Sequence, residues 1–184
     1  MQVLSKEGSR EFRFKITLCG DWAVGKTSLV RRFADNTFSH DYLATLAVNH
    51  TTKSIVLDGV RISLIIWDSG GQERFTQLRK SYYQNSDGVI FVFDLTRPES
   101  FRHIEERWVP EVNGVLKDYA PTVWGAKADL VEQRVVSAGS GERLARDVNG
   151  YYFETSALTG DNVEQAFHSL ARRVLSRALT KSMQ

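Results

Sequence analysis

The stretch Gly20-Asp21-Trp22-Ala23-Val24-Gly25-Lys26-Thr27 decides the fold of this 184-residue chain. It fits the pattern of a glycine, four residues of any type, and then Gly-Lys followed by Ser or Thr. Backbone N–H groups can converge on phosphate oxygens only in an uncrowded glycine loop, and a helix that begins there points its positive dipole end at the anion. Lys26 adds a full charge near the β- and γ-phosphates, and Thr27 offers a hydroxyl to Mg²⁺. This phosphate loop (Gly20–Thr27) predicts a nucleotide site, but a GTPase, a kinase and an ATPase all remain open.

The sequence on either side supplies the context that a phosphate loop needs. The apolar run Phe12–Cys19 predicts a strand directly before the loop, and a helical pattern follows at Lys26–Ala34. Further strands are expected at Val48–Leu57, Val60–Trp67, Val89–Leu95, Thr122–Ala126 and Tyr151–Thr155. The dipeptide Asp58-Gly59 joins the first two of these as a hairpin, because it is the strongest short signal for a two-residue turn.

The remaining helices follow from apolar spacing. Helical spacing over Phe101–Tyr119 is interrupted by Pro110 and Gly114, which predicts a kink. Two more helices are expected at Glu142–Val148 and at Asp161–Leu179, the second with Asp161-Asn162 as its cap. Strands that alternate with helices predict an α/β domain, with a mostly parallel six-stranded sheet, one antiparallel edge strand, and helices on both faces.

Composition indicates one globular domain. Hydrophobic residues make up 42%, charged residues 25%, and the net charge of +2 gives no reason to expect nucleic acid as a partner. The single cysteine, Cys19, lies in an apolar run, which favours core packing over a reactive thiol. We expect a cytoplasmic monomer with a flexible extension at 1–11, one domain at 12–178 and a tail at 179–184. The four histidines (His40, His50, His103 and His168) show no metal-ligand spacing and are expected on the surface or in loops.

A second loop reads Trp67-Asp68-Ser69-Gly70-Gly71-Gln72-Glu73-Arg74-Phe75. An Asp at the end of a buried strand can reach a phosphate-bound Mg²⁺. A glycine three residues later can offer its N–H to a terminal phosphate, and the glutamine after it can orient a water molecule. Alone, an Asp near Gly-Gly is an ordinary turn. Together with the phosphate loop it indicates a nucleotide switch.

On these two loops the chain resembles the Ras superfamily, and the Rab branch in particular, whose usual wording is W-D-T-A-G-Q-E-R-F. The similarity covers residues 12–178. The other segments that match the family are Ser81-Tyr82-Tyr83, Phe93-Asp94-Leu95-Thr96, Glu99-Ser100-Phe101, Lys127-Ala128-Asp129-Leu130 and Glu154-Thr155-Ser156-Ala157. The resemblance implies a P-loop NTPase G domain that binds GTP or GDP with Mg²⁺ and hydrolyses GTP slowly. Asp129 accounts for the choice of base, because guanine presents two adjacent donors to a carboxylate and adenine does not.

The resemblance also implies a role for each matched residue. Phe38 would stack on guanine, Tyr42 would cover the phosphates, and Gly71 would bond the γ-phosphate. Lys127 would lie along the base, while Ser156 and Ala157 would complete its pocket. The catalytic residues would be Gln72, Lys26 and Thr45, and the Mg²⁺ residues Thr27, Thr45 and Asp68. The full nucleotide set is Asp21, Trp22, Ala23, Val24, Gly25, Lys26, Thr27, Ser28, Phe38, Tyr42, Thr45, Gly71, Ala126, Lys127, Asp129, Leu130, Ser156, Ala157 and Leu158.

Four positions depart from the family's wording. Ala126 stands where the N-K-x-D motif has Asn, and losing that side chain's hydrogen bonds costs about 1–3 kcal/mol. We therefore expect weaker nucleotide binding or faster nucleotide exchange, with the preference for guanine kept. Trp22 replaces a small residue and is expected to slow hydrolysis, whether intrinsic or stimulated by an activator. Ala23 replaces a usual Gly, which adds about 1 kcal/mol of strain if φ is positive there. The first switch, Tyr42–His50, also differs in its flanking residues. The rival interpretation is therefore a nucleotide-binding interaction module with negligible hydrolysis; an ATP-using kinase is less favoured, because no lid motif is visible.

Partner proteins are expected at the two switches. Effectors, exchange factors and activators would bind residues 36–50 and 69–83. The chain ends Lys181-Ser182-Met183-Gln184 with no cysteine to prenylate, so no direct lipid anchor is expected in this sequence. The basic residues of the last helix suit a helix C-terminus better than a membrane surface. A location peripheral to the cytosolic face of a membrane remains an alternative to a purely cytoplasmic one.

Overall fold

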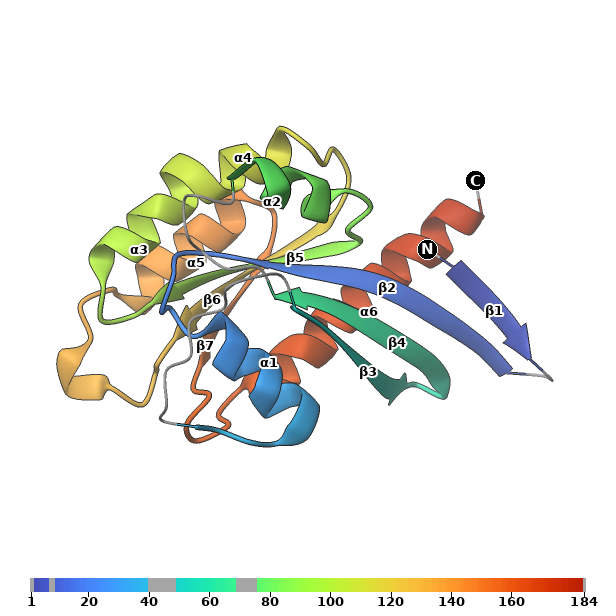
Figure 1. The fold of residues 1–184 in the computed structure, drawn as a ribbon, viewed down its shortest axis with the longest axis horizontal. Coiled ribbons are helices and arrows are strands. Elements are labelled where there is room, and N and C mark those ends of the chain that lie inside the picture. The colour runs from blue at the N-terminus through green and yellow to red at the C-terminus, as the bar shows by residue number, and fades with distance from the viewer. Residues whose placement is uncertain (1, 7–8, 40–48, 69–75, 184) are drawn as a thin grey trace.

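A twisted sheet forms the centre of the protein (Figure 1). The computed structural model describes residues 2–6, 9–39, 49–68 and 76–183. The main sheet has the order β3-β4-β2-β5-β6-β7. Its strands are β2 (Ser9–Cys19), β3 (Asn49–Leu57), β4 (Val60–Asp68), β5 (Gly88–Asp94), β6 (Ala120–Ala126) and β7 (Tyr151–Thr155). All pairs are parallel except β3 with β4, which confirms the predicted six-stranded sheet with one antiparallel edge strand.

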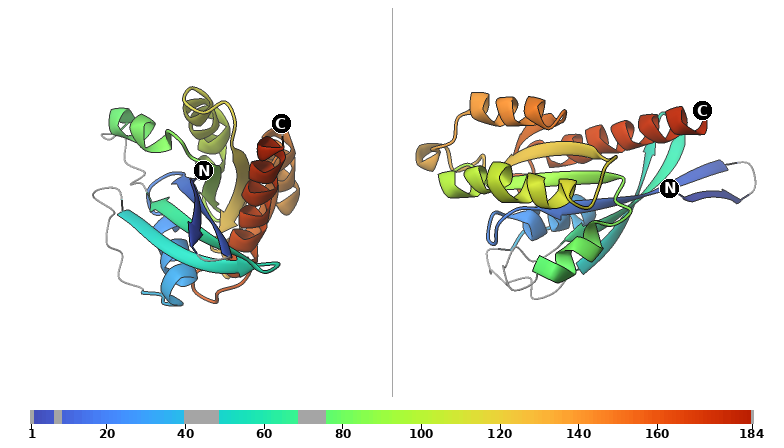
Figure 2. Two further views of the ribbon diagram at one scale, coloured as in Figure 1. Left: turned by 90° about the vertical axis from the view of Figure 1, so that its right-hand side faces the viewer. Right: turned by 90° about the horizontal axis from the view of Figure 1, so that it is seen from above.

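A seventh strand, β1 (Gln2–Lys6), pairs antiparallel with the first half of β2. It was not predicted, because the short mixed sequence Gln-Val-Leu-Ser-Lys carries no clear alternation. Residues 1–11, expected as an extension, thus include β1 and the beginning of β2. The β1–β2 hairpin projects from the end of the sheet where both termini lie (Figure 2).

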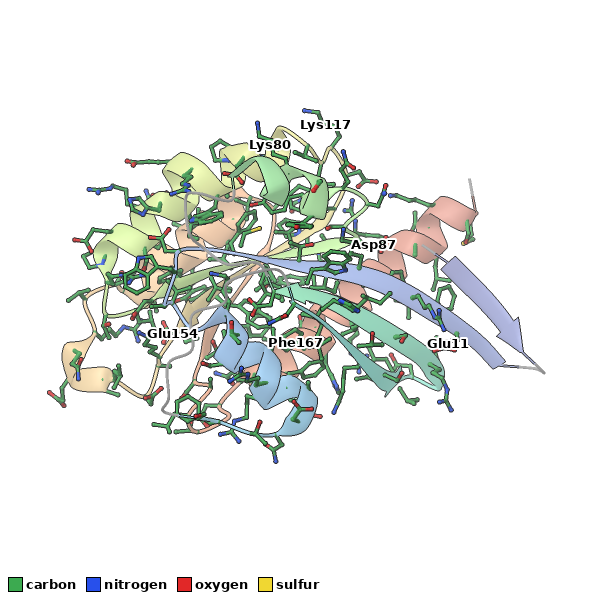
Figure 3. All side chains as sticks on the ribbon, in the orientation of Figure 1. Glu11, Lys80, Asp87, Lys117, Glu154 and Phe167 are labelled. Atoms are coloured by element: carbon green, nitrogen blue, oxygen red, sulfur yellow. The ribbon has the colours of Figure 1, made fainter. Side chains whose placement is uncertain are left out.

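Helices cover both faces of the sheet (Figure 1). On one face lie α1 (Lys26–Asp35) and α6 (Val163–Ser182), whose Phe33 and Phe167 stack at 4.0 Å between ring centroids. Phe167 lies where these two helices meet beneath the sheet (Figure 3). The other face carries α2 (Thr76–Tyr83), α3 (Pro98–His103), α4 (Val109–Asn113) and α5 (Ala138–Asp147). A short 3-10 helix, η3, spans Val131–Gln133. Cys19 is fully buried among the side chains of this second face, as predicted.

The two-residue hairpin is confirmed. Asp58 and Gly59 have φ of 50° and 77°, and Leu57 pairs with Val60 across the turn. Positive φ at both central positions is the geometry that matches the twist of the flanking strands.

The predicted kinked helix is interrupted by a π-helical turn. Between α3 and α4 lies the π-helix η2 (Ile104–Trp108), and the Val109 N–H donates to the Ile104 carbonyl five residues earlier. Pro110 follows at once, where a proline ring disturbs regular α-helical bonding. The segment ends at Asn113, so extending the helix to Tyr119 was wrong. Such π turns are rare in proteins, and those that do occur are often found at functional sites.

The two ends of α6 also differ from expectation. Asn162 stands at the N-cap position, but its φ is 57° and its side chain makes no capping bond. Its Nδ2 instead donates to the Glu154 carbonyl at 2.8 Å, so the predicted cap was wrong. At the other end α6 continues to Ser182, into residues expected as a tail. Within the described ranges, no helix combines the length and the apolar character needed to cross a bilayer.

Candidate nucleotide site

The phosphate loop joins the end of β2 to the start of α1 and requires its first glycine. A Cβ at Gly20 would come within 2.1 Å of the Val92 carbonyl oxygen, and φ there is 148°. Gly25 precedes α1 in the left-handed region with φ of 106°. Ala23 has φ of 59°, so the condition under which Ala was expected to cost about 1 kcal/mol holds.

Lys26 lies inside the loop. Its side chain is 6% exposed, and Nζ donates to the carbonyl oxygens of Gly20 and Asp21, both at 2.7 Å. A buried ammonium group is costly unless it is hydrogen-bonded. These two bonds therefore fix the cation at the mouth of the loop, where a phosphate oxygen can share it.

Thr27 and Asp68 meet at the start of α1 and the end of β4. The Thr27 hydroxyl donates to Asp68 Oδ2 at 2.5 Å. Asp68 is 3% exposed, and its Oδ1 is buried without a hydrogen-bond partner among the described residues. Burial raises the pKa of Asp68, although the Thr27 hydrogen bond and the charges of Lys26 and Arg31 oppose the shift. A buried carboxylate oxygen with no partner, next to a hydroxyl, is a donor set that fits Mg²⁺.

The predicted base-binding residues come together at the end of β6. The Ser156 hydroxyl donates to Asp129 Oδ1 at 2.5 Å, which holds the carboxylate in one orientation. Lys127, with φ of 64°, pairs through Nζ with Asp94 Oδ2 at 2.6 Å. Ala126 is 2% exposed, and a Cβ at Gly25 would lie 3.8 Å from the Ala126 Cβ. Position 126 therefore lies beside the phosphate loop, as the missing Asn implied.

Arg32 links the phosphate helix to the second base loop (Ser156–Leu158). From α1, its Nε donates to the Ala157 carbonyl at 2.7 Å and its Nη2 to the Leu158 carbonyl at 2.8 Å. Sequence reasoning missed this residue, because 125 positions separate Arg32 from Ala157 and no motif includes both. Arg32 fixes the backbone of the residues expected to complete the guanine pocket.

Three residues around α3 contact the outer side of the phosphate loop. His103 Nδ1 and Trp108 Nε1 bond the two carboxylate oxygens of Asp21 at 2.7 and 2.9 Å. Arg97 Nη2 donates to the Trp22 carbonyl at 2.9 Å. The His103 side chain is 36% exposed, which agrees with the expected surface position, although it also bonds the phosphate loop. The Trp22 side chain is 56% exposed, on the outside of the loop.

Some predicted site residues lie outside the described residues: Tyr42, Thr45, Gly71 and Gln72. Phe38 follows the end of α1 and is half-buried. Of the remaining loop residues, Val24 is fully buried and Ser28 is half-buried in the first turn of α1, while Leu130 is half-buried and Leu158 exposed. Among the described residues, no three His, Cys, Asp or Glu side chains form a group that could hold a metal.

An aromatic row joins the two segments expected to bind partners: His50 ends the first, Tyr82 belongs to the second, and Trp67 lies between them in the chain. The rings of His50 and Trp67 have centroids 6.0 Å apart, and those of Trp67 and Tyr82 5.9 Å apart. Lys15 Nζ lies 4.2 Å from the centre of the Trp67 ring. Burial lowers the pKa of Lys15, and the nearby Asp87 opposes that shift. This row offers flat aromatic surface with a cation beside it.

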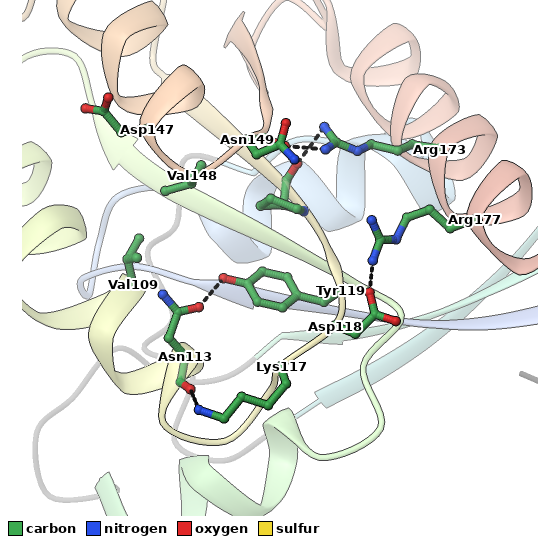
Figure 4. A pocket seen from close by; sticks show the side chains of 11 residues that line it. Val109, Asn113, Lys117, Asp118, Tyr119, Asp147, Val148, Asn149, Arg173 and Arg177 are labelled. Carbon is green, nitrogen blue, oxygen red and sulfur yellow. Dashed lines mark hydrogen bonds and ion pairs between the residues drawn. The ribbon is translucent and has the colours of Figure 1, made fainter. Parts of the chain in front are cut away.

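A separate hollow of about 350 Å³ lies at the opposite end of β6 (Figure 4). Its basic side chains already have partners. Arg173 donates to the Asn149 carbonyl, Arg177 pairs with Asp118, and Lys117 Nζ donates to the Asn113 carbonyl at 3.0 Å. None of the residues that line the hollow belongs to the phosphate loop, so the hollow is not the nucleotide site.

Comparison with known proteins agrees with this geometry. Residues 15–176 match the model of the Ras family. The chain belongs to the Ras family. It is 41% identical to the Ras-related protein Rab-1 of Theileria parva over 163 residues, which cover 88% of this chain and 74% of that relative. It is 41% identical to human Ras-related protein Rab-30 over 169 residues, 91% of this chain and 83% of the relative. Ras-related protein RIC1 of rice is 38% identical over 168 residues, with the same coverage of 91% and 83%.

These matches confirm the predicted resemblance: the protein is a Rab-like small GTPase of the Ras family. Its fold is the α/β fold expected from the phosphate loop, with that loop at the carboxyl end of β2. The match to the Ras family excludes the kinase and ATPase interpretations, which the phosphate loop alone had left open.

Proposed function

We propose that this Ras-family protein is a slow GTP-hydrolysing switch that regulates membrane traffic through partner proteins. Mg²⁺ and GTP or GDP would bind between the phosphate loop, Asp68 and the base loop (Ala126–Leu130). The observation that carries the proposal is the buried Asp68 carboxylate, with one oxygen on Thr27 and the other without a partner in the described part of the chain. The relatives' names, Rab-1 and Rab-30, support the traffic role.

Each group has a defined task in this proposal. Bound Mg²⁺ would neutralise charge on the phosphates. Lys26 would share its two carbonyl-bonded protons with the β- and γ-phosphate oxygens, while Thr27 and Asp68 would hold the ion directly and through water. Gln72 would orient the attacking water and Thr45 would sense the γ-phosphate. Asp129, oriented by Ser156, would accept from the two guanine donors.

Hydrolysis is proposed to be slow because of Trp22. Its exposed indole, on the outside of the loop, obstructs the approach of a partner's side chain to the γ-phosphate. Replacing Trp22 with Ser should accelerate hydrolysis of pre-bound GTP, measured in a single turnover with an activating protein present. An unchanged rate would contradict this explanation. The second candidate is an interaction module that binds nucleotide with negligible hydrolysis, and phosphate release over hours with excess Mg²⁺ tests it: no release would favour that module over a GTPase.

Partner binding is proposed at residues 36–50 and 69–83, which the aromatic row His50-Trp67-Tyr82 joins. The order of these segments would depend on Mg²⁺ and the γ-phosphate and would be lost after hydrolysis. We propose a monomer that acts in the cytoplasm or at the cytosolic face of a membrane, without nucleic acid as a partner.

The base preference gives the sharpest test of nucleotide binding. GTP, GDP and ATP compete for the purified protein, and we expect the guanine nucleotides to displace a bound fluorescent GDP while ATP does not. Asp129→Asn should lose GTP and gain xanthosine triphosphate, because xanthine has a carbonyl where guanine has an amino group and an amide can donate to it. Equal binding of ATP and GTP, or an unchanged preference in Asp129→Asn, would overturn the proposed function.

A further inference from the structure

We propose that His103 and Trp108 are positioning residues that slow nucleotide release by holding Asp21 of the phosphate loop. The inference rests on the proposed function, since it concerns the nucleotide that this loop would bind. Neither residue belongs to any motif that predicted the site.

The contact is made of two bonds to one carboxylate. His103 Nδ1 lies 2.7 Å from Asp21 Oδ2, and Trp108 Nε1 lies 2.9 Å from Oδ1. An ionised carboxylate can only accept, so both ring nitrogens donate. The Asp21 side chain is 13% exposed, and Trp108 is fully buried. Hydrogen bonds to a buried charge are stronger than those between neutral groups.

The π turn explains how both donors reach the same carboxylate. His103 and Trp108 are five residues apart, which in an α-helix separates their directions by about 140° around the axis. A π turn closes its hydrogen bonds between residues five apart, so the two residues come nearer to one face. η2 (Ile104–Trp108) begins directly after His103 and ends at Trp108. The rare helical geometry therefore occurs where it directs two side chains at the phosphate loop.

Asp21 connects these donors to the cation of the site. Its carbonyl oxygen accepts from Lys26 Nζ at 2.7 Å, while its carboxylate accepts from His103 and Trp108. The next residue, Trp22, is held through its carbonyl by Arg97 at 2.9 Å. Residues 21 and 22 are thus held by several bonds, which would keep their N–H groups in place for a bound phosphate.

The arrangement also manages the charge of Asp21. A carboxylate in an anion-binding loop repels phosphate unless its charge is compensated. The two donors from α3 and η2 compensate it. Removing either donor should both loosen the loop and leave the negative charge less compensated, and both changes favour nucleotide release.

The experiment measures release of a fluorescent GDP analogue from the full chain after addition of excess GDP. His103→Leu and Trp108→Phe each remove one donor, and each should release nucleotide roughly tenfold faster, as expected for a bond to a charged group. His103→Asn keeps a donor near the position of Nδ1 and should release at nearly the wild-type rate. In the Asp21→Ala background, His103→Leu and Trp108→Phe should have no further effect.

Trp124→Phe is the matched control, because it removes another buried indole N–H, which donates to Thr122 Oγ1 at 2.9 Å. It should lower the melting temperature without accelerating release. Equal release from wild type, His103→Leu and Trp108→Phe would overturn the inference. So would an acceleration that persists in Asp21→Ala or is matched by Trp124→Phe. If the wild-type protein binds no guanine nucleotide, the proposed function fails as well. If the wild-type protein binds guanine nucleotide, but His103→Leu and Trp108→Phe release it at the wild-type rate, this inference fails alone.

Discussion

Restoring the amide at position 126 should slow nucleotide release. Ala126 is 2% exposed at the end of β6, and a Cβ built on Gly25 would lie 3.8 Å from the Cβ of Ala126. The amide of Asn extends beyond Cβ, so in Ala126→Asn it can reach the phosphate loop from the base loop. One hydrogen bond between buried groups that otherwise lack a partner is worth about 1–3 kcal/mol. Since about 1.4 kcal/mol corresponds to a tenfold change in affinity, the rate of nucleotide release should fall by roughly fivefold to a hundredfold.

The added volume works against this gain. Position 126 is close-packed, and inserting atoms into a packed core typically costs about 1–3 kcal/mol. This cost falls on the free and the nucleotide-bound protein alike, so it lowers the melting temperature without changing release. Measuring both quantities separates the two effects.

The assay is release of a fluorescent GDP analogue, with Ala126→Leu as the control. Leu resembles Asn in size but offers no polar atom, so it carries the packing cost without the hydrogen bond. We expect slow release from Ala126→Asn alone. If Ala126→Asn releases as fast as wild type, or if Ala126→Leu slows release equally, position 126 does not connect the two loops and our reading of this departure is wrong.

Three further predictions follow from the site and its surroundings. Arg32→Ala should release GDP several-fold faster, and Arg32→Lys should rescue it only in part, because an ammonium group lacks the fork that bonds the Ala157 and Leu158 carbonyls; equal release from all three proteins would contradict this. Asp68→Asn should raise the melting temperature of the nucleotide-free protein, because burial disfavours the ionised Asp68 carboxylate and raises its pKa. The same substitution should abolish the effect of Mg²⁺ on nucleotide affinity, and a lower melting temperature would contradict the prediction. Burial raises the pKa of Tyr119 from 10.0 to about 12, so the stabilisation that this proton provides is complete below pH 10 and is lost as pH rises toward 12; phenolate absorbance and unfolding at alkaline pH would show it, and a Tyr119→Phe protein with the same pH dependence would refute it.

Local patterns predicted the elements that position the site. The strand, loop and helix around Gly20–Thr27, the Asp58-Gly59 hairpin and the strands predicted to end at Trp67 and Ala126 were all found, the first of these strands one residue longer, because each depends on neighbouring residues. The condition attached to Ala23, a positive φ at a position where the family usually has glycine, also holds. A motif reports geometry that a few consecutive residues impose, and that part of the site could be predicted.

The contacts that hold the loops could not be predicted in this way. Arg32 meets Ala157 across 125 residues, and Asp21 meets His103 across 82. Neither pair has a fixed spacing, because the sheet topology brings them together and side chains elsewhere decide the final distance. The π turn was missed for a related reason: helical periodicity marks which face is apolar, and it does not distinguish bonding to the fourth residue from bonding to the fifth.

The contacts found only in the structure bear on the loss at Ala126. That position lacks a side chain joining the base loop to the phosphate loop, a loss of about 1–3 kcal/mol. Arg32 joins α1, which continues directly from the phosphate loop, to two carbonyls of the second base loop, and each such bond contributes about 0.5–1.5 kcal/mol. The two Arg32 bonds are therefore of the right size to offset the loss. Asp21 is held independently from the α3 side, so the loop keeps its direction even where the base loop no longer contacts it. Weak nucleotide binding consequently does not follow from Ala126 alone, because other residues of this chain hold the same loops.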